Sequence, residues 1–495
     1  MAKKKETGPA RTGKAGKTAE MANAYQKRRA KAQAKATAQA EGEVRRVEGL
    51  SVLNSHAAGI DIGARSHWVC VGVSPDKDAA VIREFSAYTE GLHDVMAYLR
   101  QYEVTTVAME STGIYWIALY ELLEANGFEV LLVDPSYTKQ VRGRPKTDRL
   151  DCQWIYRLHS VGLLAAAFRP DEKTCQLRSY LRQRANVIRY AGQHIQHMEK
   201  ALEQMNLKLT ETISDITGMT GQAIIKAILR GTRDPVKLAK FRDPRIKASE
   251  EQIAQALTGS YRDEHLCALK LAFDAWQFYQ KQLDQIDAQI EQQLSRMKQD
   301  RALPPLKPHK RSGGRKPNHP RFDVRTALYY VVGIDLTEIE GIEEMTALTI
   351  ISEIGADMSQ FATVHHFCSW LGLCPHLKKT GGRVKSSHTR PGVNRAAVAF
   401  RLAANGLHAS KGAIGAFLRR KKAHLGAPKA VTAAAHKLAR IVYLALKHGM
   451  TYIRQTQEEH EARVREQQLK SLHKKARALG MEVIEKPALE TPTTA

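Results

Sequence analysis

Four acidic residues lie at positions where their carboxylates could act together on a phosphate group. Asp61 lies inside a short apolar run, Glu110 ends another, and Asp148 and Asp151 share the segment Lys146-Thr-Asp-Arg-Leu-Asp151. A spacing of three residues puts Asp148 and Asp151 on one face of a helix. Asp61 needs an explanation, because a charge buried in an apolar strand is costly unless it has a role or a partner. The pattern predicts that the four carboxylates converge on one site.

Carboxylates that close repel one another, and a hard cation is the usual remedy. Mg²⁺ prefers oxygen ligands in octahedral geometry and is the expected occupant. Two such ions beside a scissile phosphate can stabilise both the attacking and the leaving oxygen. Taken singly, each acid is more often a surface charge or the partner of Arg149 or Lys146. His67 and His159, which are near in sequence, are interpreted as surface or packing histidines.

Short runs rich in β-formers alternate with helical stretches around these acids. Helices are expected at 90–102 and 115–126, and strands at 59–64, 67–73, 79–86, 104–109 and 129–133. The resulting order, β-β-β-α-β-α-β-α, is that of an RNase H-like α/β domain, here at about 50–165. The first and fourth strands are neighbours in that fold, so Asp61 and Glu110 can converge.

Helical patterns dominate the remainder. Residues 174 to about 212 and 264 to about 299 are polar with apolar positions at helical spacing, which predicts paired helices or a coiled coil. Glycine turns precede apolar helices near 216–229 and 339–354, the first compatible with a helix-hairpin-helix and the second with N–H groups directed at phosphate. The predicted divisions are a basic disordered tail at 1–48, a helical spacer at 166–300, a basic linker at 301–325, a mainly helical domain at 326–452 and a charged tail at 453–495.

Composition points to a nucleic-acid partner. The chain of 495 residues carries 76 Lys and Arg against 51 Asp and Glu, a formal charge of +25, and such a surplus attracts phosphate backbones. The basic tail at 1–48 is interpreted equally as a solubilising segment or a binding arm. Six cysteines without a CxxC pair fit a reducing cytosol. No apolar run approaches the roughly 18 residues of a membrane helix, so a cytoplasmic location and no membrane partner are expected.

The sequence resembles the DEDD transposases of insertion sequences, the one-ten family, over about 55–450. The residues that carry the resemblance come from two separate regions and keep their order. They are Gly59-Ile-Asp-Ile-Gly63, Met109-Glu-Ser-Thr-Gly-Ile-Tyr115, Val133-Asp-Pro135, Lys146-Thr-Asp-Arg-Leu-Asp151, Trp370-Leu-Gly-Leu-Cys-Pro375, Thr380-Gly-Gly382 and Arg390-Pro-Gly-Val-Asn-Arg395.

The resemblance implies a RuvC-like N-terminal catalytic domain, a long helical spacer and a C-terminal transposase domain that supplies a nucleophilic serine. It also implies donor and target DNA as substrates, assembly into homo-oligomers, as a dimer or tetramer, and a structured bridge RNA that guides the choice of DNA. The composition alone indicates only that this positively charged chain attracts phosphate groups.

Thr380 occupies the position at which the resemblance implies a serine nucleophile. The segment reads Lys378-Lys-Thr-Gly-Gly382. Threonine has the hydroxyl that a serine would supply, although its methyl group hinders attack of the oxygen on phosphorus. Ser386 and Ser387 are the alternative nucleophiles, and Thr380 could instead be only a turn residue before two glycines.

A basic cluster surrounds Thr380 in the sequence. It could neutralise a pentacovalent phosphate, although most members of such clusters grip the nucleic-acid backbone. No acid nearby completes a triad with His388, so activation of the hydroxyl by the metal site or by Arg is favoured. The cluster consists of Lys378, Lys379, Arg383, Lys385, Arg390 and Arg395.

These observations favour a magnesium-dependent DNA transposase or recombinase that cuts and rejoins strands. Thr380 or a neighbouring serine is expected to form a transient phospho-enzyme bond. The alternatives are a RuvC-like junction resolvase or nuclease that uses metal-activated water, and a non-catalytic nucleic-acid-binding protein. The presence of all four acids favours an enzyme over a binding protein, and the second domain favours a recombinase over a nuclease.

Overall fold

The computed structural model describes residues 51–74, 77–111, 113–135, 147–308, 318–390, 392 and 394–483. The predicted tail at 1–48, Lys146, part of the basic linker and the last residues of the charged tail lie outside them. The chain separates into two compact units, with the division between Arg169 and Pro170. None of the described helices is long and apolar enough to cross a membrane.

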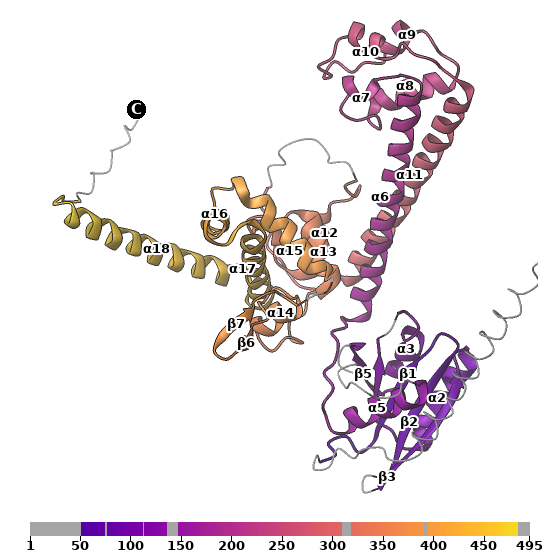
Figure 1. The fold of residues 1–495 in the computed structure, drawn as a ribbon, viewed down its shortest axis with the longest axis vertical. Coiled ribbons are helices and arrows are strands. Elements are labelled where there is room, and N and C mark those ends of the chain that lie inside the picture. The colour runs from indigo at the N-terminus through magenta and orange to yellow at the C-terminus, as the bar shows by residue number, and fades with distance from the viewer. Residues whose placement is uncertain are drawn as a thin grey trace, which may run out of the picture. The chain divides into compact units, whose positions relative to one another are not determined.

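The first unit contains a five-stranded mixed sheet in the order β3-β2-β1-β4-β5 (Figure 1). The first three strands form an antiparallel meander, whereas β4 runs parallel to both β1 and β5. The strands are β1 (Ala57–Ile62), β2 (Ser66–Ser74), β3 (Lys77–Ser86), β4 (Thr106–Glu110) and β5 (Glu129–Val133). The predicted sequence of three strands followed by alternating helices and strands is therefore present.

Helices cover both faces of this sheet. Alternation along β1 directs Ala58, Ile60 and Ile62 to one face, where they share a core with α2 (Thr89–Gln101) and α3 (Ile117–Ala125). The opposite face is covered by a third helix, α5 (Asp148–Ser160), which contacts β1, β2 and β4. A small cluster formed by Ala108, Val133 and Ile155 joins α5 to this face.

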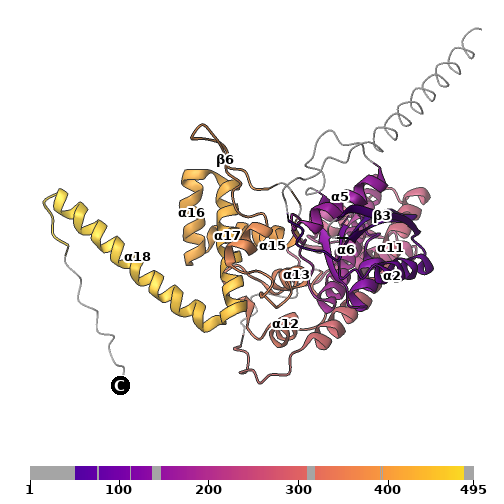
Figure 2. The same cartoon turned by 90° about the horizontal axis from the view of Figure 1, so that it is seen from below.

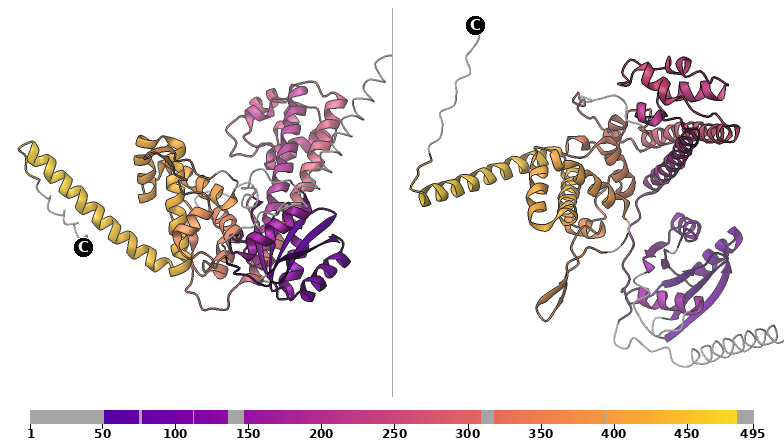
Figure 3. Two further views of the ribbon diagram at one scale, coloured as in Figure 1. Left: turned by 60° about the horizontal axis from the view of Figure 1, so that its bottom comes forward. Right: turned by 45° about the horizontal axis from the view of Figure 1, so that its top comes forward.

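The second unit begins with two long helices that lie side by side (Figures 1 and 3). They are α6 (Glu172–Gln204) and α11 (Asp263–Met297). A buried ion pair between Arg184 and Asp287 connects them. At one end of the pair, four short helices form a separate apolar core with both long helices. These are α7 (Leu209–Thr212), α8 (Met219–Leu229), α9 (Pro235–Ala239) and α10 (Glu250–Ala256).

The rest of the second unit is mostly helical. Phe367 is fully buried between the rings of Phe361 and Tyr443, and the Tyr443 hydroxyl donates a hydrogen bond to the Phe361 carbonyl at 2.9 Å. Two short strands, β6 (Lys378–Thr380) and β7 (Arg383–Ser386), form a separate hairpin. The helices are α12 (Val324–Val332), α13 (Glu344–Ile354), α14 (Val364–Trp370), α15 (Arg395–Gly406), α16 (Ala413–Leu425), α17 (Ala427–His448) and α18 (Met450–Ala478), with single 3₁₀ turns at Leu336–Glu338 and Leu407–Ala409.

Arginines of α6 connect the long helices to α13. Arg182 donates to both carboxylate oxygens of Glu353, at 3.1 and 2.8 Å. Arg178 reaches the same carboxylate at 3.2 Å and also donates to the Glu353 carbonyl at the end of α13. Because an Arg and a carboxylate that share two hydrogen bonds are geometrically constrained, these contacts fix the position of α13 on α6.

Candidate active site

Asp61 lies on the face of the sheet that α5 covers. It shares this face with Gly59, because alternate residues of a strand point the same way. The helix passes so close to Gly59 that a Cβ there would lie 2.1 Å from the Tyr156 nitrogen and 2.5 Å from the Cys152 carbonyl oxygen. The absence of a side chain at Gly59 therefore allows the backbone of α5 to approach the strand that carries Asp61.

Glu110 ends the neighbouring strand on the same face. In the parallel pairing of β1 with β4, Gly59 is opposite Ala108 and Ile60 is opposite Met109. Continuing this register by one residue puts Glu110 beside Asp61. Ala108, two residues before Glu110, packs against Ile155 of α5, which confirms the direction in which this set of side chains points. Both Asp61 and Glu110 are half-buried.

The first turn of α5 carries Asp148 and Asp151. The Thr147 hydroxyl caps the helix by accepting a hydrogen bond from the Leu150 nitrogen at 3.3 Å. Asp151 is half-buried and Asp148 is exposed. Two acids in the first turn are favoured by the partial positive charge of a helix N-terminus. The same charge reduces the repulsion between these acids and the carboxylates of the sheet.

Cys152 links the start of α5 to Asp61. The pKa of its thiol is raised by contact with the Cys70 thiol, by burial and by the negative charge of Asp61. Asp61 is therefore close to the first turns of α5. Among the described residues, however, no three His, Cys, Asp or Glu side chains are grouped closely enough to hold one metal ion. Strand register thus places Asp61 beside Glu110, and α5, which covers the same face, carries Asp148 and Asp151 in its first turn. The described side chains do not gather all four acids into one cluster.

Trp68 and Glu84 continue the row of side chains that contains Asp61. Trp68 is directly opposite Asp61 in the pairing of β1 with β2, and Glu84 is directly opposite Trp68 in the pairing of β2 with β3. Trp68 is half-buried, and the register places it next to Asp61 on the same face of the sheet. Neither residue was predicted from the sequence, because this row depends on cross-strand register.

Both histidines near the acids are buried, which agrees with a packing role. His67 is on the opposite face of β2 from Trp68, and burial lowers its pKa. His159 of α5 shares a hydrogen bond of 3.0 Å with the Thr106 hydroxyl. Burial lowers the pKa of His159 to about 4, so its imidazole is neutral at pH 7. Neither ring adds positive charge beside the carboxylates at that pH.

Thr380 lies at the tip of the β6–β7 hairpin, which projects from the surrounding helices (Figure 3). Gly381 and Gly382 form the turn with φ values of 54° and 75°, and two successive positive φ values favour glycine. The strand pairing puts Arg383 directly opposite Thr380. Thr380 is exposed, so its hydroxyl is accessible to a ligand.

Comparison with protein families covers both regions. Residues 58–207 match the family model for the DEDD transposase domain of IS110, described as a transposase, and residues 335–413 match the transposase family IS116/IS110/IS902. Two regions of this chain therefore match families of IS110-type transposases. A search of curated proteins found no match. The first matched region contains the four acids and the second contains Thr380. Transposases cut and join DNA, so the chain is a DNA-processing enzyme.

The alternative hydroxyls of the transposase lie at the base of the hairpin. Ser386 is opposite Lys378 in the strand pairing, and its hydroxyl accepts a hydrogen bond from the His388 nitrogen at 3.4 Å. Ser387 is exposed just beyond β7. Both serines are therefore separated from the Gly381–Gly382 turn by the length of β7.

The predicted basic cluster divides between the hairpin and the segment that follows it. Arg395 is the first residue of α15, whose N-terminus is capped by Asn394 through a hydrogen bond from the Ala397 nitrogen at 3.1 Å. Arg390 precedes that cap. The remaining members, Lys378, Lys379, Arg383 and Lys385, are all exposed on β6 and β7.

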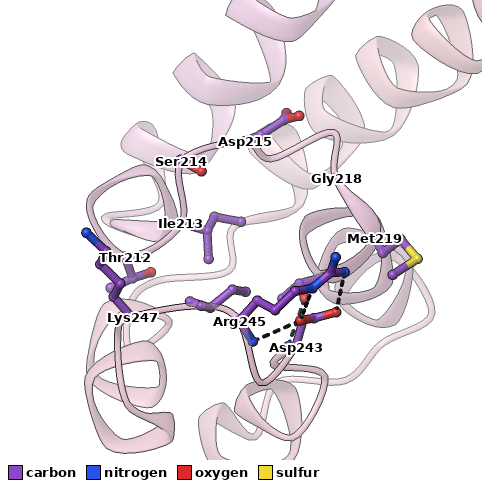
Figure 4. A pocket seen from close by; sticks show the side chains of 11 residues that line it. Thr212, Ile213, Ser214, Asp215, Gly218, Met219, Asp243, Arg245 and Lys247 are labelled. Carbon is purple, nitrogen blue, oxygen red and sulfur yellow. Dashed lines mark hydrogen bonds and ion pairs between the residues drawn. The ribbon is translucent and has the colours of Figure 1, made fainter. Parts of the chain in front are cut away.

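The first predicted glycine turn borders a pocket at the end of the long helices (Figure 4). The pocket has a volume of about 680 Å³ and includes Gly218, which precedes α8. Arg245 lines it but is paired with Asp243 through two side-chain hydrogen bonds of 2.9 Å. This pairing neutralises the guanidinium, so the pocket has less attraction for phosphate than its residue types suggest.

Replacing Gly59 with alanine is expected to destabilise the first unit of the transposase and to abolish strand cleavage. The new methyl group would overlap the backbone of α5, and overpacking against main chain costs about 3 kcal/mol or more. The measurement is amide hydrogen exchange of β1 and α5, together with a cleavage assay. Gly192→Ala is the matched control, because Gly192 lies within α6 and a Cβ there would meet no other atom within 4 Å. That change is expected to stabilise its helix by roughly 0.5–1 kcal/mol. Unchanged exchange in Gly59→Ala would contradict the proposed close contact.

Proposed function

We propose that this transposase cuts and rejoins DNA strands with a Mg²⁺-dependent carboxylate site and a separate hydroxyl nucleophile, under the direction of a guide RNA. The catalytic domain is assigned to 50–165 and has an RNase H-like, RuvC-like fold. A helical spacer at 166–300 follows, and a C-terminal transposase domain at 326–452 supplies the nucleophile. The observation that carries the proposal is the register that puts Asp61 beside Glu110 under the start of α5.

The donor chemistry of the site fits Mg²⁺. Asp61, Glu110, Asp148 and Asp151 offer only carboxylate oxygens, which are the ligands that hard divalent cations prefer. The sheet supplies two of them from adjacent strand ends, and the first turn of α5 supplies the others. A bound metal ion would offset the negative charge of the phosphate and of these acids.

Thr380 is the proposed nucleophile. Its hydroxyl oxygen would form a bond to the scissile phosphorus as the bond from phosphorus to the leaving sugar oxygen breaks, and the hydroxyl proton would end on that sugar oxygen. Rejoining would reverse this exchange. The Gly381–Gly382 turn carries no side chains that would obstruct a DNA backbone near the hydroxyl. Arg383, opposite Thr380, is placed to offset charge on the phosphate. Lys378, Lys379, Lys385, Arg390 and Arg395 are assigned to backbone binding.

The proposal also includes assembly. Thr380 and the carboxylates belong to different units of the chain. In the proposed strand exchange the carboxylates and the hydroxyl take part in the same reaction, and the transposase works as a dimer or tetramer. The charge of +25 suits simultaneous binding of donor DNA, target DNA and a structured RNA.

Guidance is tested by changing the RNA rather than the protein. We expect recombination between a donor end and a target only when the RNA transcribed from that end is present. Altering its target-pairing segment should move insertion to the newly complementary DNA. Sequencing of nuclease-protected RNA from the purified complex identifies the guide, and sequencing of the joined DNA gives the insertion site. A scrambled RNA of equal length is the control. Efficient recombination at one fixed site by RNA-free protein would show that the guided mechanism is wrong.

A further inference from the structure

The chain has a long stretch without acidic residues in its C-terminal half. No Asp or Glu occurs between Asp357 and Glu458, an interval of 100 residues that contains 17 Lys and Arg. Where the structure describes this interval, its Lys and Arg side chains form no ion pair with a carboxylate. Like charges at this density repel one another in the folded protein. A polyanionic ligand would relieve that repulsion.

The helices α16 and α17 pack against each other (Figure 2), and several of these cations belong to them. Around the ring of Phe417 lie Arg420 at 5.9 Å, Lys421 at 5.7 Å and Lys437 at 5.0 Å from the centroid. Arg440 is less than one helical turn beyond Lys437 on α17. The pKa of Lys437 is lowered by burial and then by the charges of Arg420 and Arg440. Together, Arg420, Lys421, Lys437 and Arg440 are called the α16–α17 basic surface.

Glu340, whose negative charge raises the pKa of Lys437, already has another role. Glu340 accepts hydrogen bonds from the Ile414 nitrogen at 3.0 Å and the Gly415 nitrogen at 3.2 Å, at the N-terminus of α16. Gly412 leaves room for this carboxylate, since a Cβ there would lie 2.3 Å from the Glu340 Cδ. Glu340 is the last and weakest influence on the pKa of Lys437, after the two arginines. It therefore fixes α16 more than it neutralises the basic surface.

We propose that the α16–α17 basic surface binds the phosphodiester backbone of a nucleic-acid duplex, separately from the β6–β7 hairpin. The inference rests on the proposed function in taking nucleic acid as the ligand. The surface presents four cations and no carboxylate that could accept from base edges, so it recognises phosphate rather than sequence. The cations come from two packed helices, and three of them already contact the Phe417 ring without the ligand, which lowers the entropic cost of binding.

The test compares two double variants of the full chain that lose the same charge. Arg420→Gln with Lys421→Gln removes two cations of the basic surface. Arg262→Gln with Lys270→Gln removes two exposed cations whose charge is balanced by Glu264 and Asp274. Fluorescence anisotropy measures affinity for a duplex DNA and for an RNA hairpin over a range of salt concentrations. The assay contains chelator, so a failure of the cleavage mechanism does not affect it.

We expect the α16–α17 variant to bind nucleic acid roughly tenfold or more weakly than wild type. The slope of its log affinity against log salt concentration should become less steep by about 1 to 2, because each phosphate contact on B-DNA contributes about 0.9 to that slope. The paired-charge control should keep the wild-type slope, and Arg420→Lys with Lys421→Arg should keep both slope and affinity. If affinity falls for only one of the two ligands, that ligand is the kind of duplex that the surface binds. Equal slopes for the α16–α17 variant and wild type with both ligands would overturn the proposal.

Discussion

Replacing Asp61 with asparagine is expected to reduce strand cleavage on the order of 10²–10³-fold or more while DNA binding persists. The side chain keeps its size but loses the charge that the proposed metal site requires, and removal of one preorganised electrostatic group has effects of this size. Binding should remain or tighten slightly, because a carboxylate without its cation repels phosphate. The measurement is single-turnover cleavage with Mg²⁺, beside an anisotropy assay of DNA affinity.

Glu84→Gln is the matched control for Asp61→Asn. Glu84 lies in the same row on the same face of the sheet, with Trp68 between it and Asp61. It is exposed, so its loss should leave cleavage within about twofold of wild type. Asp148→Ala should resemble Asp61→Asn. Wild-type cleavage by Asp61→Asn, or in excess chelator, would show that the carboxylates are not the catalytic site. If Glu84→Gln lowered the cleavage rate as much as Asp61→Asn, the effect would come from the overall negative charge of the sheet and not from Asp61 itself.

Replacing Thr380 with valine is expected to eliminate strand cleavage without unfolding the protein. Valine nearly matches threonine in shape and favours β-strands, so the hairpin should be kept. Only the proposed nucleophile is lost. Thr380→Ser keeps the hydroxyl without the methyl group and should retain or raise the cleavage rate. Ser386→Ala and Ser387→Ala should have milder effects, because both residues lie at the base of the hairpin.

A nicked suicide substrate makes the nucleophile directly observable. The trapped product is digested, and mass spectrometry locates the peptide that carries DNA. We expect the adduct on Thr380. An adduct on Ser386 or Ser387 would transfer the role to that serine. Normal cleavage with no adduct would favour hydrolysis by water, as in a junction resolvase.

The order of strands and helices in the first unit could be predicted because each run has its own periodicity. The β1 strand alternates Ala58, Ile60 and Ile62 with Gly59 and Asp61, which both indicates a strand and marks its buried face. Which residues lie opposite one another on neighbouring strands cannot be derived from the periodicity of a single strand. Trp68 and Glu84 lie in the row of Asp61 only because of register, and a shift of one residue would move them to the other face.

The β6–β7 hairpin was not predicted from the sequence. Its strands are short, charged and exposed, so they lack the apolar alternation that marks a half-buried strand. Gly381–Gly382 was the available signal, since two glycines between short runs favour a tight turn. The tight approach of α5 was also not predicted. Gly59 was recognised within a motif, but its contact is with a helix that begins 89 residues later.

Because of its contact with α5, Gly59 should be essential for transposition although it takes no part in the chemical reaction. A selection for transposition over all single substitutions should deplete every change at Gly59 as strongly as changes at the acids, although glycine neither binds nor reacts with DNA. Ile60, the next residue, is fully buried among side chains that can repack and should accept valine or leucine. A map of tolerated substitutions would then mark the main-chain contact between β1 and α5 as part of the active site. Chimeras of two related transposases should stay active only when β1 and α5 both come from the same parent.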